Sequence, residues 1–130
     1  YNAFYKREGP TAVSQEVTDT PWARFFDPNE PVYAFVAEDA GRLAGMTHYL
    51  FHRTTTSINL NCYLQDLFTL PDQRGKGVGR ALIEAVHGEA KKAGSMRLYW
   101  LTQSDNVTAR KLNDKVAAHT GFITYIKPVE

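Results

Sequence analysis

Apolar runs and turn sequences alternate along the first part of the chain in a way that is typical of strands. A β-branched and aromatic run covers residues 32–37, a polar turn follows at 38–42, and a second apolar run covers 43–51. These three segments predict an antiparallel hairpin. A third strand is predicted at 60–70, and Pro71 ends it.

Helical spacing follows in the later part of the chain. After a group of glycines, apolar residues recur at helical spacing, and the pattern ends at Gly94. These apolar residues are Val78, Ala81, Leu82, Ala85, Val86, Ala90 and Ala93. A further helix is predicted at 106–118, between strands predicted at 96–101 and 122–126. This succession of elements indicates a mixed α/β fold class, with a largely antiparallel sheet flanked by helices.

Helical signals also precede the first strand. They cover residues 11–17 and resume after Thr20, which suits a helix cap, and Pro21, which suits the first helical position. The sequence at 27–28 is expected to end this region. The chain opens at Tyr1 inside an amphipathic segment, so its N-terminus is expected to be truncated.

Composition predicts one domain, covering residues 1–130, because 130 residues with 43% hydrophobic content suffice for a single packed core. The 15 Lys and Arg balance 14 Asp and Glu, which argues against nucleic acid or an anionic membrane as the main partner. A small molecule or a protein side chain is the expected partner. One cysteine, Cys62, permits no intrachain disulfide, and no stretch resembles a signal peptide or a membrane span. A cytoplasmic protein is therefore expected.

Gly75, Gly77 and Gly79 alternate between the third predicted strand and the helix that follows it. Glycines here remove side chains where backbone N–H groups at a helix start would face an anion, which predicts a phosphate-binding loop. A nucleotide-hydrolysing loop is disfavoured, because Gly77 stands where Ser or Thr must follow Gly-Lys. The dinucleotide fingerprint also fails, since Leu82 stands at its third glycine. A tight turn with a glycine cap is the alternative.

The segment Arg74-Gly75-Lys76-Gly77-Val78-Gly79 resembles the acetyl-CoA signature of the GNAT superfamily of N-acetyltransferases. The resemblance extends upstream over residues 63–71 and downstream over Tyr99-Trp100-Leu101-Thr102, Asn106, Ala109, Leu112 and Gly121-Phe122. It is most similar to the branch of yeast histone and polyamine acetyltransferases and their bacterial relatives. It implies a GNAT-type, mostly antiparallel twisted sheet, whose first strand is missing from the start of this chain.

The resemblance implies acetyl-CoA as the cosubstrate. Backbone N–H groups of the loop would bind its pyrophosphate, and the strand around Phe68 would pair with the pantetheine arm like an added strand. Asn106 matches a cofactor contact of the family and also suits an N-cap. The predicted cofactor-binding residues are Leu67, Phe68, Thr69, Arg74, Gly75, Lys76, Gly77, Val78, Gly79, Arg80 and Asn106. The histidines lack metal-ligand spacing, so no metal is expected.

Acetyl transfer to an amine also needs a polarised carbonyl and a base. The resemblance implies that the backbone N–H at about Phe68 polarises the thioester, freed from the sheet by a strand bulge. Asp66 is the candidate base, because a charge in an apolar strand beside the loop is costly without a purpose. Glu38, His48 and His52 are weaker candidates, since exposed turn residues and hydrogen-bonded surface histidines are more common.

Asn113 stands where the family usually carries a tyrosine that protonates the departing thiolate. A carboxamide can donate a hydrogen bond but has no useful proton to give, so acid catalysis could be lost or passed to water. The resemblance implies an enzyme that moves acetyl from acetyl-CoA to a primary amine: a small polyamine-like or amino-acid-like amine, or a protein lysine. A non-catalytic or weakly active acyl-CoA-binding module is the alternative. A homodimer would be ordinary for such a domain.

Overall fold

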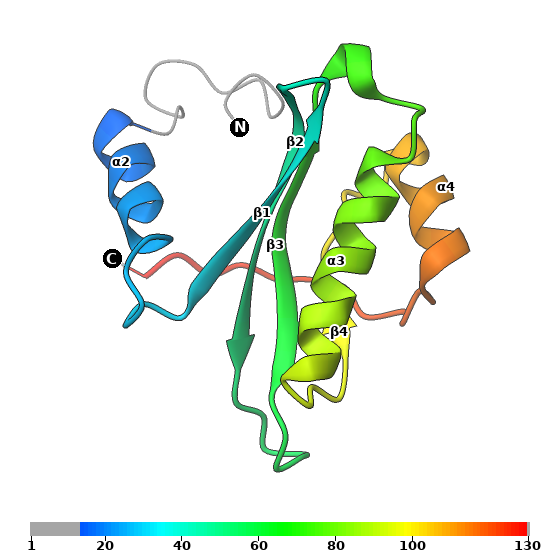
Figure 1. Cartoon of the computed structure of the whole chain (residues 1–130). Coiled ribbons are helices and arrows are strands. Elements are labelled where there is room, and N and C mark those ends of the chain that lie inside the picture. Colours follow the sequence, from blue (N-terminus) through cyan, green and yellow to red (C-terminus); the bar gives the residue numbers. More distant parts are fainter. Residues whose placement is uncertain (1–13, 130) are drawn as a thin grey trace. The chain divides into compact units, whose positions relative to one another are not determined.

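The computed structural model describes residues 14–129, which fall into two compact units divided after Trp100. Figure 1 shows the elements along the chain. The described part of the first unit contains a four-stranded sheet, the helices α2 (Gln15–Arg24) and α3 (Val78–Lys92), and a short 3-10 turn. The described part of the second unit contains the helix α4 (Val107–Val116).

The sheet has the strand order β1-β2-β3-β4. β1 (Val32–Asp39), β2 (Arg42–His52) and β3 (Asn61–Thr69) are antiparallel neighbours, and the short strand β4 (Leu98–Tyr99) joins β3 in parallel. The turn between β1 and β2 places Gly41 at a φ of 79°, as tight hairpins require. The predicted hairpin, the third strand and the mixed α/β fold class are confirmed.

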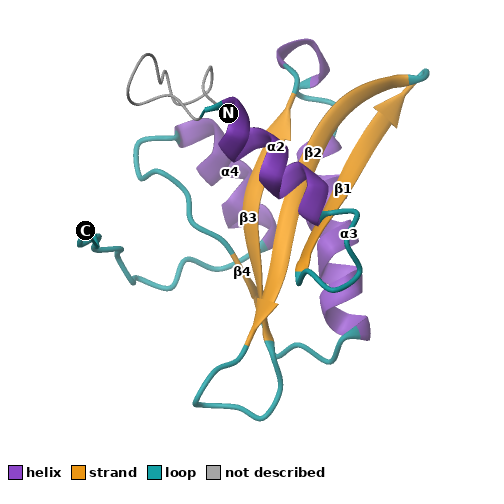
Figure 2. Ribbon diagram, turned by 90° about the vertical axis from the view of Figure 1, so that its left-hand side faces the viewer, coloured by secondary structure: helices purple, strands orange, loops and turns teal. Residues whose placement is uncertain are grey.

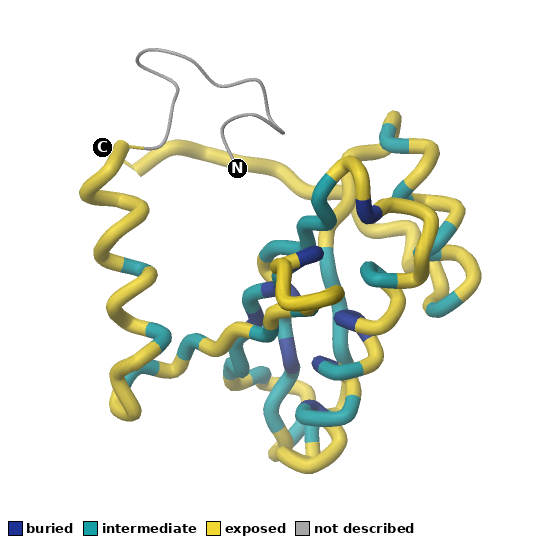
Figure 3. The backbone as a smooth tube through the Cα atoms, turned by 45° about the horizontal axis from the view of Figure 1, so that its top comes forward, coloured by how far each residue is buried: buried dark blue, intermediate teal, exposed yellow. Residues whose placement is uncertain are grey.

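One face of the sheet is covered by α3, which contacts β1, β2 and β3 (Figure 1). The helix forms where the apolar spacing predicts it, and its buried residues lie on one face: Leu82, Ile83, Val86 and Ala90. The sheet contributes further buried residues, namely Ala44, Thr47, Tyr49, Cys62 and Leu64. Figure 3 shows buried positions on the strands and along this helix.

Tyr49 organises the aromatic part of the core. Its ring stacks on Tyr33 and Phe35 of β1, with ring centroids 5.4 and 5.6 Å away. Burial, with a smaller contribution from Glu89, raises the pKa of Tyr49 to about 12. The phenol therefore stays protonated in the folded protein at neutral pH.

Gly45 lets β3 and the first turns of α3 approach β2 closely. A Cβ atom at this residue would lie 2.7 Å from the Phe68 carbonyl oxygen, 3.0 Å from Val78 Cγ1 and 3.3 Å from Leu82 Cδ1. The contact with the carbonyl oxygen is too short for real atoms, so any side chain here would displace the strand or the helix. The glycine thus fixes the start of α3 against the end of β3.

α2 lies on the opposite face of the sheet from α3 (Figure 2). Its N-cap is Ser14, whose Oγ accepts a hydrogen bond from the Val17 N–H at 3.3 Å. Pro21 lies inside the helix, so the predicted helix start at Thr20 was wrong. A serine cap satisfies the helix donors earlier in the chain, and one proline on an exposed helix removes only one backbone hydrogen bond.

The second unit departs from the prediction at its end. α4 confirms the helix predicted at 106–118, but the strand predicted at 122–126 is absent from the described structure. Its apolar side chains are 74 to 87% exposed, namely Phe122, Ile123, Tyr125 and Ile126. An extended segment becomes a strand only when a neighbouring strand pairs with it, and residues 101–129 contain no strand. The features predicted for residues 1–5 and 11–13 lie outside the described residues.

Candidate active site

The glycine loop joins β3 to α3 through the 3-10 turn η2 (Pro71–Gln73). Gly75 and Gly77 adopt left-handed backbone conformations, with φ angles of 78° and 81°. Gly77 is the N-cap of α3, and no side chain caps the helix there. The first helical hydrogen bond runs from the Ala81 N–H to the Gly77 carbonyl oxygen at 3.0 Å. The N–H groups of residues 78–80 therefore have no acceptor within the helix and suit an anion.

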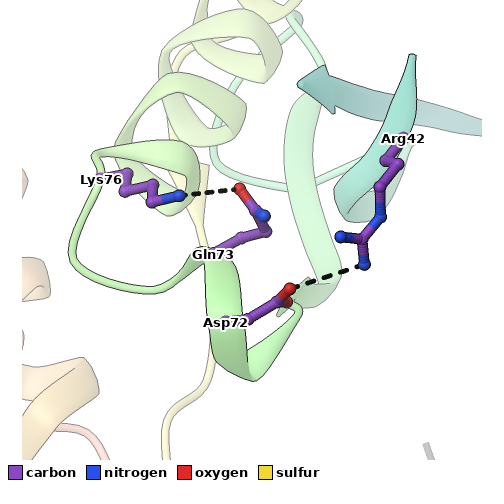
Figure 4. A network of polar contacts seen from close by, with 4 residues as sticks. All are labelled: Arg42, Asp72, Gln73 and Lys76. Carbon is purple, nitrogen blue, oxygen red and sulfur yellow. Dashed lines mark hydrogen bonds and ion pairs between the residues drawn. The ribbon is translucent and has the colours of Figure 1, made fainter. Parts of the chain in front are cut away.

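Two polar contacts flank this loop (Figure 4). Lys76 Nζ lies 3.5 Å from Oε1 of the buried Gln73, and Arg42 forms an ion pair with Asp72 at 3.5 Å. The ion pair is exposed, so it contributes little to stability. The hydrogen bond from Lys76 to Gln73 instead links the tip of the loop to the buried residue at the end of the 3-10 turn.

Part of the β3 edge beside the loop is unpaired. β4 pairs with β3 only through Cys62 and Tyr63, so no described strand lies on that side of β3 from residue 64 to 69. At the end of this open edge, the Thr69 carbonyl oxygen accepts a hydrogen bond from Arg74 Nε at 3.2 Å. Arg74 therefore fixes the loop to the strand end.

The backbone groups of β3 alternate between β2 and the open edge. The Leu70 N–H donates to a β2 carbonyl oxygen at 2.9 Å. Since alternate residues face the same side, Phe68 also directs its N–H and carbonyl groups to β2. The Phe68 oxygen lies beside the Cβ position of Gly45 on β2, in agreement with this alternation. Leu67 and Thr69 consequently direct their backbone groups to the open edge.

A bulge in β3 precedes the open edge. The adjacent β2 residues His48 and Tyr49 pair with Asp66 and Leu64, so Gln65 is the additional residue. Without the bulge, Asp66 would share the core-facing side of the strand with Leu64. The extra residue places Asp66 on the face that carries His48, away from α3.

Asp66 and His48 form a pair on this face. Asp66 Oδ2 lies 3.0 Å from His48 Nδ1, and the two side chains are 29 and 19% exposed. The Thr47 hydroxyl donates to the Asp66 carbonyl oxygen at 2.7 Å. Phe25, at the end of α2, stacks on the imidazole with ring centroids 4.6 Å apart. The sequence indicated both members separately, but their contact depends on a bulge that has no sequence signature.

His52, by contrast, uses both ring nitrogens in structural contacts. Its Nδ1 lies 2.8 Å from the Arg53 carbonyl oxygen, and its Nε2 lies 2.7 Å from the Tyr99 hydroxyl. Because a carbonyl can only accept, Nδ1 carries the proton and Nε2 accepts from Tyr99. Burial raises the pKa of Tyr99, and its ring stacks on Tyr63 at 4.9 Å. His52 therefore fills the role of a hydrogen-bonded histidine.

The second unit carries the two predicted asparagines. Asn106 is the N-cap of α4, where its Oδ1 accepts from the Ala109 N–H at 3.1 Å. Asn113 donates from Nδ2 to the Thr102 hydroxyl at 2.8 Å. The N-cap role that the sequence suggested for Asn106 is confirmed. The side chain of Asn113 fixes the segment before α4 and offers no acid.

Other reactive groups of the first unit are inert or exposed. Cys62 is fully buried, and burial raises the pKa of its thiol to about 11, which keeps it protonated. Glu38 is an exposed residue near the end of β1. Among residues 14–129, no cluster of three His, Cys, Asp or Glu side chains could hold a metal ion. The helices described in that range are all too short or too polar to cross a membrane.

The fold places an uncapped helix start after an open strand edge, an arrangement that suits an anionic ligand. The sequence model of the acetyltransferase (GNAT) family matches residues 1–117. The chain therefore belongs to the GNAT family and is an N-acetyltransferase by class. Enzymes of this family use acetyl-CoA.

One yeast relative and two solved structures illustrate the similarity. The D-amino-acid N-acetyltransferase HPA3 of Saccharomyces cerevisiae is 37% identical over 127 residues, covering 96% of this chain and 76% of that protein. This confirms the predicted yeast branch.

The aminoglycoside acetyltransferase meta-AAC0020, from an uncultured soil metagenomic sample and in complex with sisomicin, has a TM-score of 0.81 at 15% identity, over 99% of this chain and 83% of that one. The structure of AAC(6')-Iy with the bisubstrate analog CoA-S-monomethyl-acetylneamine has a TM-score of 0.76 at 17% identity, over 92% and 83% of the two chains. At these identities, the two structures show the fold alone.

Proposed function

We propose that this chain transfers the acetyl group of acetyl-CoA to the primary amine of a small, amino-acid-like molecule. The observation that carries the proposal is an uncapped helix start at Gly77 that follows an open strand edge at residues 67–69. A helix start attracts a pyrophosphate, and an open strand edge pairs with an amide-containing arm. Acetyl-CoA contains both groups.

The loop from Arg74 to Arg80 binds the pyrophosphate in this proposal, mainly through its backbone N–H groups. Lys76 and the exposed Arg80 add positive charge near the phosphates. Leu67 and Thr69 face the open edge, so their backbone groups pair with the pantetheine arm.

The Phe68 N–H, to which the resemblance gave the role of polarising the thioester carbonyl, is directed at β2, so in this proposal an N–H group of Leu67 or Thr69 polarises it. Phe68 anchors the segment to β2. Asp66, in contact with His48, supplies the carboxylate of the group that accepts the proton of the amine. Asn106 caps α4 with its oxygen and keeps its amide donor for the cofactor.

The two units are proposed to form one acetyltransferase domain over residues 1–130, because the family match crosses the division after Trp100. The single cysteine, Cys62, is a buried free thiol, which supports the cytoplasm as the compartment. The exposed apolar segment at 122–126 supports a homodimer.

The nature of the amine is proposed from one relative and one surface. The yeast relative is named for D-amino acids. Phe25 stacks on His48, and the neighbouring Trp22 and Phe26 are 55 and 72% exposed, which gives an apolar surface beside Asp66. Such a surface suits an amino acid with an apolar side chain better than a polyamine, whose several ammonium groups need several carboxylates.

A second candidate function is a weakly active acyl-CoA-binding module, which binds acyl-CoA and releases its thiol slowly. Asn113 is the residue that supports this candidate. Its carboxamide has no proton to give the departing thiolate, and its donor is already directed at Thr102. The thiolate then takes its proton from water or from the amine.

The test is CoA thiol release from acetyl-CoA with D-amino acids, L-amino acids, polyamines and lysine peptides. Cys62 is buried and does not compete for a thiol reagent in the folded protein. We expect release with amino acids, and release about tenfold faster or more in Asn113→Tyr, since an acid typically contributes ~10²–10⁴ in rate. CoA binding without release from any amine, in both proteins, would overturn the proposed activity.

A further inference from the structure

We propose that His48 takes the proton from the acceptor amine and that Asp66 acts through His48 by holding its ring in position. This inference rests on the proposed function and assigns its base. It starts from a buried nitrogen: His48 Nε2 is hidden from solvent and has no hydrogen-bond partner among the described residues. Buried polar atoms without a partner are rare in folded proteins, and a catalytic role is one of their recognised causes.

The Asp66 carboxylate fixes the protonation pattern of the ring. A carboxylate only accepts hydrogen bonds, so at 3.0 Å from Asp66 Oδ2 the His48 Nδ1 is the protonated nitrogen. In the neutral ring, Nε2 then carries a lone pair. When Nε2 accepts a proton, the carboxylate stabilises the imidazolium that results.

The surroundings of the ring leave Nε2 as its reactive atom. Among the described contacts, Asp66 is the titratable group that touches His48. On the neighbouring strand β1, Ala34 pairs with His48. Phe25, at the end of α2, covers one face of the imidazole ring. An amine entering from the side of α2 would supply the hydrogen-bond donor that Nε2 lacks. His52 does not compete, because both of its ring nitrogens are already engaged.

The pair is also close to the proposed position of the thioester. Asp66 and Phe68 lie two residues apart on the same side of β3, and a strand rises ~3.3 Å per residue, so they are separated by about 7 Å. Leu67, whose backbone faces the open edge, lies between them. The Asp66–His48 pair therefore lies on the stretch of the sheet next to the proposed position of the thioester.

The proton and electron balance follows from this arrangement. The acceptor arrives as an ammonium ion and gives one proton to His48 Nε2, which frees the nitrogen lone pair. The nitrogen forms a bond to the thioester carbon, and the carbon–sulfur bond breaks with its electron pair on sulfur. The second proton of the nitrogen passes to the thiolate, directly or through water, and His48 gives its proton to water that enters as the products leave. No acid from Asn113 is needed.

His48→Gln tests the base directly. Gln keeps a donor for Asp66 and a similar volume, but it cannot accept the proton. We expect kcat/KM for amine acetylation to fall about 10²-fold or more, with CoA affinity unchanged. The pH dependence of kcat/KM should also change in this variant, because the proposed base is absent. His87→Gln, which alters an exposed histidine of α3, is the matched control and should keep wild-type activity.

His48→Ala with added imidazole supplies a second, independent measurement. Free imidazole in the space left by the ring should restore activity in proportion to its neutral form, and it should not stimulate the Asp66→Asn variant. Turnover by His48→Gln within about twofold of wild type, or no imidazole rescue of a folded, CoA-binding His48→Ala, would overturn the assignment of the base while leaving the acetyltransferase intact. A wild-type chain that releases no thiol with any amine would overturn the proposed function and this inference together.

Discussion

The two helices α3 and α4 begin in opposite ways. α3 starts at Gly77, which adopts a φ of 81°. Glycine has no side chain that could cap the helix, so the first N–H groups of α3 stay uncapped. α4 starts at Asn106, whose own oxygen takes the Ala109 N–H at 3.1 Å. A helix start that is already capped has fewer donors for an anion, so the comparison favours α3 over α4 for the phosphate-binding role that we propose.

The same two helices differ in how they are packed. α3 buries four residues against the sheet, whereas none of the described residues of α4 is buried. A helix that must present donors at a fixed place needs rigid support, and the core beneath α3 supplies it. The predictions below test this difference from the largest expected effect to the smallest.

Gly45→Ala should produce the largest loss of stability. The added Cβ would meet the Phe68 carbonyl oxygen at 2.7 Å, so the strand or α3 must shift. We expect this shift to lower the unfolding free energy by about 3 kcal/mol. Gly88→Ala is the control within α3, where a Cβ meets no atom within 4 Å and the helix should gain up to about 1 kcal/mol. Denaturant unfolding measures both; equal effects at the two glycines would contradict the close approach at Gly45.

Val86→Ala and Val116→Ala compare the two helices directly. Val86 of α3 is fully buried, so its truncation should cost about 2 kcal/mol in unfolding free energy through lost burial and a cavity. Val116 of α4 is partly exposed, and its truncation should cost less than about 1 kcal/mol. Thermal unfolding of the two variants gives the ratio, and a larger loss at Val116 would reverse the ranking of the helices.

Cys62 reports on the same core through pH. Burial raises the pKa of its thiol from the ordinary 9.0 to about 11, so the thiol ionises at a lower pH in the unfolded chain than in the folded one. The stabilising effect is complete below pH 9 and is lost as pH rises toward 11, by about 1 kcal/mol at pH 10. The difference in unfolding free energy between the wild type and Cys62→Ala should shrink over this range. A constant difference would mean that the thiol is not buried as described.

Local patterns predicted the parts of the molecule that depend on neighbouring residues. Helical spacing located α3, alternating and apolar runs located β1 to β3, and the glycines located the loop, because each of these signals acts over a few residues. The strand expected at 122–126 depended on a distant partner, and residues 101–129 contain no strand with which it could pair. The helix start expected at Thr20 was wrong for a local reason, because Ser14 caps the helix earlier in the chain.

The site could be predicted only in part, because some of its contacts depend on residues that are distant in the sequence. The loop residues and Asp66 stand in a recognisable order, so the sequence named them as candidates. The contact between Asp66 and His48 depends on the extra residue Gln65 in β3, and a bulge leaves no pattern in one sequence. The direction of the Leu67 and Thr69 backbone groups likewise follows from strand register, which the structure alone provides.

The most direct measurement of the central claim, that the start of α3 holds the pyrophosphate of acetyl-CoA, is calorimetric titration of CoA and of pantetheine into three proteins. These are the wild type, Gly77→Val and Gly41→Val; both glycines have positive φ and open space around them, so the backbone strain is matched. We predict that Gly77→Val loses about tenfold or more of its affinity for CoA and none for pantetheine, while Gly41→Val keeps both. Equal CoA affinities in the two variants would contradict the account.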